Sequence, residues 1–295
     1  MKEILFSRIL KKALFKGAFF VSVVFGFSSS YADNLCQVSN KSNTEEAIVK
    51  WVYDGDTLLV TDVNGNNKQK IRIIGIDTPE VKHHQQKAQL YGAKAREELR
   101  VLLKEANNRV FLEFGKEKHD RYKRSLAHVY LENGINISEW LLRQGFAKIL
   151  VFPPNVKHAE CYRNVERKAQ QQKRKLWKLK SNRIKTPQDL KSRSKGYVRL
   201  KGKISHIKMH KKSFVLELEG DFKKPIQLKI KKKNLSYFKG LDFERLIAQE
   251  VIVSGILKQK KLKRIINLNH SSQLELVPTN GTGSKPIAPT IKWST

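Results

Sequence analysis

Short runs of alternating apolar and polar residues fill much of the chain after residue 47 and predict a protein built mainly of β-strands with a few helices. A period of two sends successive side chains to opposite faces of a strand, so these runs fit sheets with a buried face. In the first half of the chain they predict strands at 48–53, 57–62, 68–76, 109–114 and 125–131.

Helical spacing interrupts these strands. Apolar residues three or four positions apart predict a helix over 92–106, a second over 137–144, which Gly145 ends, and a third over 155–176. Five strands with a helix after the third follow the order of an OB barrel. We therefore expect residues 47–177 to form one OB barrel with three helices.

A second series of alternating runs begins at Tyr197. It predicts strands at 198–204, 213–218, 226–230, 251–257 and 274–277, with a short helix over 238–247. This order indicates a second, smaller OB-like β-barrel over 197–277, which makes the fold class mainly β with helices. The remaining segments are expected to be an amino-terminal arm, a basic linker and a disordered tail, at 33–46, 178–196 and 278–295.

The first 32 residues have the features of a secretory signal peptide. A basic head precedes an apolar run over 18–27 and the small residues Ser30 and Ala32, which predicts cleavage after Ala32. A membrane-spanning helix needs about 20 apolar residues, so a retained anchor is the less favoured alternative. We expect a periplasmic or secreted protein without stable membrane association.

The chain contains two cysteines, Cys36 and Cys161. Export leads to an oxidising compartment, where an isolated pair of cysteines tends to join. A disulfide is therefore expected between the amino-terminal arm and the last helix of the first barrel. Two free thiols, one packed and one exposed, are the alternative.

The chain is strongly basic, with 59 lysines and arginines against 27 acidic residues and a formal net charge of +32. Such a charge attracts polyanions, because bound phosphates release counterions. The second barrel shares this excess, which favours an auxiliary nucleic-acid-binding role. Attachment to an envelope polymer, contact with anionic lipid, a structural extension and a solvated basic surface are the alternatives.

One stretch carries the strongest chemical signal. The β-branched run 71–76 is typical of a buried strand, and Asp77 and Glu80 follow it as carboxylates that a buried strand would not carry unpaired. Arg72 lies five positions before Asp77, so the two face opposite sides of an ideal strand. They can share one site only if the strand twists or bulges near Gly75.

Two more motifs flank this stretch. Asp-Gly-Asp-Thr occupies 54–57, and Asp-Arg-Tyr-Lys-Arg-Ser-Leu-Ala occupies 120–127. Together with Arg-x-x-x-x-Asp-Thr-Pro-Glu at 72–80, they resemble the staphylococcal nuclease (thermonuclease) family over about 47–177. Each motif alone is weak, but three in this order and at compatible spacings are specific. The resemblance implies an OB fold and phosphodiester hydrolysis.

The motifs also contain a set of hard oxygen donors. Asp56 and Asp77 provide carboxylates, and the Thr78 carbonyl adds a third oxygen. No His or Cys falls within the motifs, so this donor set suits Ca²⁺ better than zinc. By resemblance, the three residues match the family's calcium ligands. The alternative for Asp56 is a side chain that caps a turn.

The resemblance implies catalytic roles for Arg72, Glu80 and Arg124. The arginines match guanidinium groups that grip the phosphate, since their forked donors fit pairs of phosphate oxygens. Glu80 matches the residue that positions or deprotonates the attacking water. The structural alternatives are an ion pair at Arg72, a loop cap at Glu80 and a surface cation at Arg124.

Substrate-binding residues follow the family less closely. Arg121 and Tyr122 lie in the third motif, where Tyr122 matches a pocket tyrosine, with core packing as the alternative. Segment 148–153 replaces a tyrosine-containing stretch, so Phe152 can stack on a base but offers no hydroxyl to a phosphate. Lys123 stands where the family often has glycine, which predicts a stiffer turn.

These observations together predict an exported, calcium-dependent nuclease whose substrates are DNA and RNA. The resemblance further implies endonucleolytic cleavage that leaves 3′-phosphate ends. No protein partner is implied. The alternative is a non-catalytic protein that binds nucleic acid or an envelope polyanion on the same fold.

Overall fold

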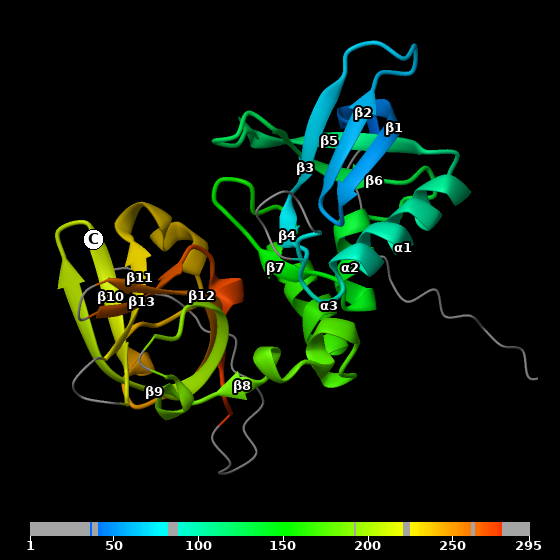
Figure 1. The fold of residues 1–295 in the computed structure, drawn as a ribbon. Coiled ribbons are helices and arrows are strands. Elements are labelled where there is room, and N and C mark those ends of the chain that lie inside the picture. The colour runs from blue at the N-terminus through cyan, green and yellow to red at the C-terminus, as the bar shows by residue number, and fades with distance from the viewer. Residues whose placement is uncertain are drawn as a thin grey trace, which may run out of the picture. The chain divides into compact units, whose positions relative to one another are not determined.

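The computed structural model describes residue 36 and residues 41–81, 88–191, 193–220, 225–260 and 263–278 (Figure 1). The expected signal peptide, half of the amino-terminal arm and nearly all of the expected tail lie outside these residues. Within them, no helix combines the length and the apolar composition that a membrane crossing requires.

Five strands close the first barrel in the order β1-β2-β3-β6-β5. All neighbours are antiparallel except β3 and β6, which run parallel. The strands are β1 (Glu45–Asp54), β2 (Thr57–Thr61), β3 (Gln69–Ile73), β5 (Arg109–His119) and β6 (Ser125–Tyr130), preceded by the 3-10 turn η1 (Lys41–Asn43). The predicted OB arrangement is confirmed.

Three helices accompany this barrel: α1 (Gly92–Glu105), α2 (Ile137–Gln144) and α3 (Ala159–Gln171). Helix α2 begins at Asn136, whose side chain accepts from the backbone N–H of Glu139, and ends at Gly145, which has a φ of 77°. The third helix is shorter than the predicted 155–176. Its last turn is followed by Lys173 and Lys175 with positive φ, and a separate 3-10 turn, η2 (Lys175–Lys178), continues the chain.

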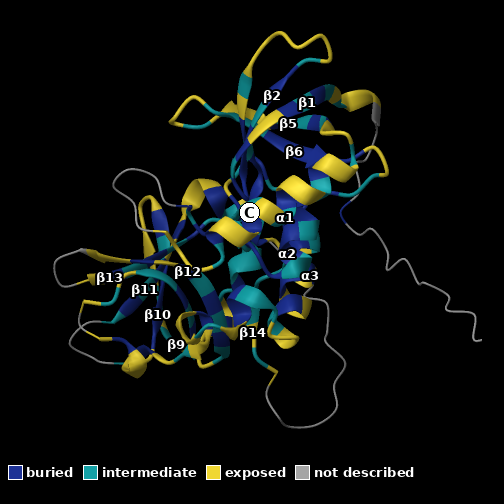
Figure 2. Cartoon of the chain, turned by 45° about the vertical axis from the view of Figure 1, so that its right-hand side comes forward, coloured by how far each residue is buried: buried dark blue, intermediate teal, exposed yellow. Residues whose placement is uncertain are grey.

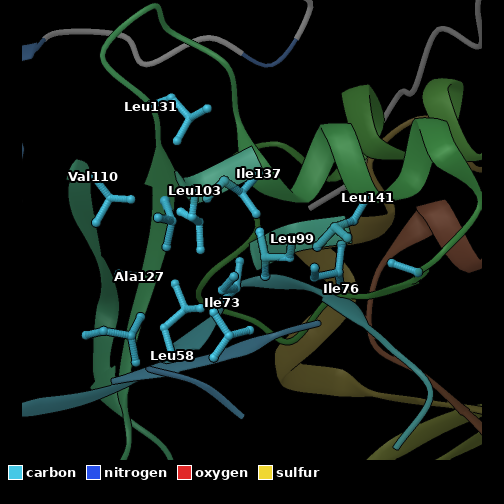
Figure 3. Packing of buried hydrophobic residues seen from close by; sticks show 14 of the residues in the cluster. Leu58, Ile73, Ile76, Leu99, Leu103, Val110, Ala127, Leu131, Ile137 and Leu141 are labelled. Atoms are coloured by element: carbon cyan, nitrogen blue, oxygen red, sulfur yellow. The ribbon is translucent and has the colours of Figure 1, made fainter. Parts of the chain in front are cut away.

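The core of the first barrel lies between these helices and the strands (Figure 3). Helix α1 turns Ala95, Leu99 and Leu103 inward, and all three are fully buried. Figure 2 shows exposed segments along the rest of this helix. Leu58 and Ile73 come from β2 and β3 to meet the same cluster. Each such leucine or isoleucine contributes about 1.5–3 kcal/mol by its burial.

The predicted strand over 68–76 is in fact two strands. Strand β3 ends at Ile73, and a new strand, β4 (Gly75–Asp77), leaves the barrel to pair with β7 (Lys148–Leu150). Gly75 makes this change of direction possible with a φ of 90°. A Cβ at Gly75 would also lie 2.4 Å from the Tyr162 ring of α3, so a larger residue has no space there.

The second barrel uses β9 (Gly196–His210), β10 (Ser213–Leu218), β11 (Ile226–Lys231), β12 (Glu250–Lys260) and β13 (Lys263–Leu268). Pairing of β12 with β9 closes it, and β11 pairs in parallel with β13. Its core is a separate cluster, with Leu200, Leu228 and Val253 among the fully buried side chains. The expected second barrel is confirmed.

Two details of the second barrel differ from the prediction. Its fifth strand is β13, which was not expected, whereas the expected strand at 274–277 is the short β14 (Leu274–Leu276), paired with β12 outside the closed ring. The helix expected over 238–247 is replaced by two 3-10 segments, η5 (Lys232–Phe238) and η6 (Glu244–Leu246). Gly240, at a φ of 101°, separates them.

The segment between the barrels is folded. It contains η3 (Lys180–Asn182), the two-residue strand β8 (Ile184–Lys185), which pairs with β9, and η4 (Pro187–Asp189). Arg199 of β9 lies 5.5 Å from the centroid of the Trp177 ring and donates a 2.6 Å hydrogen bond to Gln170 of α3. The pairing of β8 with β9 thus packs part of the connection on the second barrel.

Candidate active site

The turn between β1 and β2 carries the first motif and presents Asp56. Asp54 accepts a 3.0 Å hydrogen bond from the backbone N–H of Asp56, which is the structural turn role expected of an Asp in this position. Gly55 allows the turn to approach β4 closely, because a Cβ there would lie 2.7 Å from Cγ2 of Thr78. The first and second motifs therefore meet at this turn.

Asp56 joins these two segments through its side chain. One carboxylate oxygen, Oδ2, accepts from the backbone N–H of Thr78 at 2.8 Å and from its hydroxyl at 3.2 Å. The other oxygen, Oδ1, accepts from the Thr57 hydroxyl at 3.1 Å. Asp56 and Thr78 are both buried, so these bonds satisfy groups that would otherwise lie unpaired in a dry environment.

Arg72 lies between two carboxylates. Its Nη2 atom is 3.2 Å from Oδ2 of Asp56 and 3.6 Å from Oδ1 of Asp77. The same guanidinium donates to the carbonyl oxygens of Ile73 at 2.7 Å and Ile76 at 2.8 Å. Its orientation is therefore fixed by backbone on one side and by acids on the other.

The Asp56 carboxylate repels two neighbouring carboxylates, those of Asp54 and Asp77. Burial, and then the carboxylate of Asp56, raise the pKa of Asp54 to about 7. Although 48% of the Asp77 side chain is exposed, partial burial followed by repulsion from Asp56 raises the pKa of Asp77 to about 6, against the attraction of Arg72 and Lys148. Crowded carboxylates of this kind favour the binding of a further cation.

The third motif supplies Arg124 from a tight turn. Asp120 accepts from the Arg124 Nε at 2.8 Å and lies 2.7 Å from its Nη2, while Nη1 of Arg124 donates to the Thr57 hydroxyl at 3.3 Å. Lys123, which stands where the family often has glycine, has a φ of 62°, in the region that glycine favours. Arg124 therefore points to the residue next to Asp56, on the same edge of the barrel as Arg72.

Tyr122 and Arg121 lie on the outside of that turn. The Tyr122 side chain is 64% exposed, so the core-packing alternative is wrong. Arg121 donates a 2.6 Å hydrogen bond to the Tyr122 hydroxyl, and its guanidinium lies 4.7 Å from the centroid of the ring. Arg124 lies 5.5 Å from the same centroid. An exposed ring flanked by two cations is well suited to contact a nucleotide.

Glu80 follows β4 in a segment that is held by its backbone. Its carbonyl oxygen accepts from the backbone N–H of Gln89 at 2.9 Å, and Gly92 at the start of α1 packs so closely that a Cβ there would lie 2.5 Å from that oxygen. Within the described residues, the Glu80 carboxylate forms no hydrogen bond or ion pair. It is therefore available to a water molecule or a substrate.

Phe152 follows β7 with one residue between them. Its ring is 55% exposed and borders a hollow that Asp77 and Lys148 also line. Lys148 pairs with Asp77 across β4 and β7. The sequence analysis assigned no role to Lys148 or to Asp120. For Asp120 a signal was available, because it stands in the third motif four positions before Arg124.

The side chains of Asp56 and Asp77 supply only part of the oxygen ligands that a hard cation needs, and the Thr78 carbonyl would add one more. Among the described residues, no group of three or more His, Cys, Asp or Glu side chains gathers closely enough to hold an ion. Two carboxylates near one point leave the other positions to carbonyl or water oxygens, which is typical of calcium rather than zinc.

Known proteins share the first barrel. A family model described as "Staphylococcal nuclease homologue" matches residues 70–179. The thermonuclease of Staphylococcus hyicus is 34% identical over 140 residues, which cover 48% of this chain and 79% of that protein. The thermonuclease of Staphylococcus intermedius is 34% identical over 134 residues, covering 45% and 76%. Endonuclease YncB of Bacillus subtilis (strain 168) is 34% identical over 126 residues, covering 42% and 57%.

Similarity to thermonucleases and endonucleases, over a part of the chain that forms an OB barrel, makes this chain a nuclease, a hydrolase of phosphodiester bonds in nucleic acid. Within that class, the chain belongs to the staphylococcal nuclease family, because it is 34% identical to a relative of which it covers 79%. The resemblance predicted from the three motifs is thereby confirmed. The family model ends at residue 179, before the second barrel.

Proposed function

We propose that this protein is an exported, calcium-dependent nuclease that hydrolyses DNA and RNA internally and leaves 3′-phosphate ends. The observation that carries the proposal is the Arg72 guanidinium, which contacts both Asp56 and Asp77 within 3.6 Å. Acids from two separate segments and a phosphate-binding group therefore share one point at the barrel edge.

Arg72 and Arg124 would grip the scissile phosphate. Both guanidiniums are largely buried and are held by carbonyl or carboxylate oxygens, so they need little rearrangement when charge develops on the phosphate. Donors fixed in advance stabilise the transition state more than the ground state, and removal of one such donor typically costs about 10²–10³-fold in rate.

Glu80 would accept a proton from the attacking water. The water oxygen forms a bond to phosphorus and one water proton passes to the Glu80 carboxylate. The bond from phosphorus to the 5′ oxygen breaks, and this oxygen takes a proton from solvent, which leaves a 3′-phosphate and a 5′-hydroxyl. General-base action of this kind contributes about 10²–10⁴-fold in rate. The absence of a competing partner for this carboxylate among the described residues supports the assignment.

Asp56, Asp77 and the Thr78 carbonyl would hold calcium. When bound, the ion supplies positive charge to a phosphate oxygen. The repulsion of Asp56 with Asp54 on one side and with Asp77 on the other supports this assignment, since a divalent cation relieves such repulsion. The Asp56 bonds to Thr78 keep the donors of two segments together.

Export is supported by the disulfide between Cys36 and Cys161. It joins the segment before η1 to α3, and Asn136 donates a 3.0 Å hydrogen bond to the Cys36 carbonyl at the same place. Disulfides persist chiefly in exported proteins. The described residues thus agree with the predicted secretory signal.

Digestion of single-stranded DNA and of RNA with added Ca²⁺, then with a calcium chelator, tests the proposal. We expect internal cleavage to 3′-phosphate ends that stops when the chelator is added and resumes with excess Ca²⁺. Cleavage that is insensitive to the chelator contradicts the calcium assignment. Tight binding to DNA and to heparin without cleavage of either nucleic acid contradicts the enzymatic function and favours a polyanion-binding protein.

A further inference from the structure

A continuous row of neighbouring residues runs from the candidate active site to the second barrel. Asp77 pairs with Lys148 across β4 and β7. The Lys148 ammonium lies 4.0 Å from the centroid of the Tyr197 ring of β9. Tyr197 in turn pairs with Ile256 of β12. An active-site carboxylate and the outer surface of the second barrel are therefore only a few side chains apart.

The row continues across the outer face of the second barrel. Leu257 pairs with Ile266, which places Ile256 beside Asn267 of β13, and Asn267 pairs with Lys229 of β11. Neighbouring strands lie about 4.8 Å apart, so the four strands from β9 to β11 carry this row over about 14 Å.

Three lysines stand on this outer face. Lys229, Lys231 and Lys258 are exposed, whereas the alternating residues Leu228, Ile230 and Leu257 are buried in the barrel core. Strand periodicity therefore fixes the lysines on the outside. Among the described residues, none of the three forms an ion pair, in contrast to Lys201 and Lys208, which pair with Glu250 and Glu217.

A hollow of about 470 Å³ connects these features. Asp77, Lys148 and Phe152 line it from the first barrel, and Tyr197, Lys229 and Lys258 are among the residues that line it from the second. Glu166, the other acid at its wall, is buried and accepts a 2.8 Å hydrogen bond from the backbone N–H of Ile149. The exposed charges of the hollow are thus mainly positive.

We propose that a single strand of the nucleic-acid substrate leaves the cleavage site through this hollow and crosses the outer face of β12, β13 and β11. Lys229, Lys231 and Lys258 bind its phosphates, and the exposed ring of Phe152 stacks on a base near the entrance. We call this surface the extension groove. The inference rests on the proposed nuclease function and gives the second barrel a part in it.

A single strand suits the groove better than the other polyanions considered for this chain. Its phosphates match a line of unpaired lysines, and its unstacked bases match an exposed phenyl ring, which an envelope polymer without bases would not use. OB barrels accommodate about 4–16 nucleotides of single strand, and the groove adds such a length to a site that cleaves one bond.

The test uses the full-length protein and two charge-matched triple variants. The groove variant is Lys229→Gln, Lys231→Gln and Lys258→Gln. The control variant is Lys203→Gln, Lys211→Gln and Lys212→Gln, which removes the same charge from exposed positions on and beside β9. Binding of a 20-nucleotide single-stranded DNA is measured in chelator at several salt concentrations. Cleavage of 4- and 20-nucleotide substrates is measured with Ca²⁺.

We expect the groove variant to reduce the salt slope of binding by about 2, since each phosphate contact on a single strand contributes about 0.7. Its kcat/KM should fall about 10-fold or more on the 20-nucleotide substrate and much less on the 4-nucleotide one. The control variant should keep the wild-type slope and length dependence. Phe152→Ala should weaken binding of the long strand without changing the salt slope.

Equal salt slopes for the groove and control variants overturn the inference, as does an equal loss of cleavage on both substrate lengths. A groove variant that loses binding to heparin but keeps its wild-type binding to the 20-nucleotide strand also overturns it, in favour of an envelope polymer. Failure of the wild-type protein to cleave either substrate instead contradicts the proposed function, so the two failures are distinguishable.

Discussion

The guanidinium of Arg72 lies 3.6 Å from the carboxylate of Asp77, although the two residues are five positions apart along a stretch that reads as one strand. Gly75, with a φ of 90°, ends the straight course of the strand between them. The carbonyls of Ile73 and Ile76, on either side of this break, both accept from Arg72. The bend and the site are thus one local structure.

We predict that Arg72→Lys lowers kcat/KM for single-stranded DNA by about 10²–10³-fold, the usual cost of losing a fixed transition-state donor. A lysine keeps the charge but cannot reach two carbonyls and two carboxylates at once. Steady-state kinetics measure the loss. Arg109→Lys is the matched control, because Arg109 pairs with Glu46 at 3.0 Å away from the site, and it should change the rate less than twofold.

Asp120 is expected to act on cleavage through Arg124. Hydrogen bonds from Arg124 and Tyr122 outweigh burial and lower the pKa of Asp120, so the carboxylate stays charged and holds the guanidinium toward Thr57. Asp120→Asn should lower kcat/KM about 10-fold, the effect of weakening one charge-assisted pair.

A double-variant cycle checks this dependence. Asp120→Asn combined with Arg124→Ala should be no slower than Arg124→Ala alone, since Asp120 has no separate effect to lose. Independent, multiplying losses would contradict the assignment. Asp242→Asn is the control, because Asp242 also pairs with an arginine, Arg245 at 3.2 Å, but in the second barrel.

The disulfide should stabilise the first barrel without taking part in cleavage. Its cysteines are 125 positions apart, and a cross-link over such a loop typically contributes about 2–4 kcal/mol by restricting the unfolded chain. Replacement of Cys36 and Cys161 by serine should lower the unfolding free energy by about that amount in denaturant titrations. Reductant should lower the stability of the wild type but leave that of the double variant unchanged.

Two buried histidines should make stability depend on pH. Burial, followed by the neighbouring His158, lowers the pKa of His128 to about 3, and burial lowers the pKa of His158 to about 4. Both stay neutral in the fold but gain a proton near pH 6.5 when the chain unfolds. The contribution of the two neutral histidines to the unfolding free energy is therefore complete above about pH 6.5. It is lost as the pH falls toward 4, by up to about 1.4 kcal/mol per pH unit for each histidine.

Other groups titrate in the same range, so the measurement is a comparison. Burial raises the pKa of Glu166 from 4.5 to about 7, and its contribution to the unfolding free energy has the opposite sign, since it is lost as the pH rises from about 4.5 to 7. His158→Gln can keep a hydrogen bond to Tyr130, which lies 2.8 Å from Nε2 of His158. Its unfolding free energy should fall less steeply than that of the wild type between pH 6.5 and 4. Parallel curves would show that His158 does not contribute.

Much of the first barrel could be predicted from its sequence, because its strands alternate regularly and its helices have clear ends. The need for a twist near Gly75 was also predictable from the spacing of Arg72 and Asp77. The contact of Tyr162 with Gly75 was not predictable, since Tyr162 belongs to a helix that lies far along the chain. The same holds for Lys148, which reaches Asp77 through a long-range strand pair.

The second barrel shows why a strand can escape a pattern-based prediction. In β13, Arg264 is buried where an apolar residue is expected, and Ile265 faces outward where a polar one is expected. One of its partners, β11, is parallel and distant in sequence, so no turn signals that pairing. The other partner, β12, ends three residues before β13 begins, and the residues between them include no glycine, proline or asparagine to indicate a hairpin. The strand predicted at 274–277 is the short β14, which pairs with β12 outside the closed ring.

The most direct test of the central claim, that Glu80 works as the base beside the Arg72–Asp77 pair, is the single-turnover rate of the Glu80→Gln variant on single-stranded DNA at saturating Ca²⁺. Glutamine keeps the size of the side chain but cannot accept a proton. We expect a rate about 10²–10⁴-fold below the wild type, with unchanged DNA affinity and an unchanged melting temperature. A wild-type rate in this variant would contradict the account.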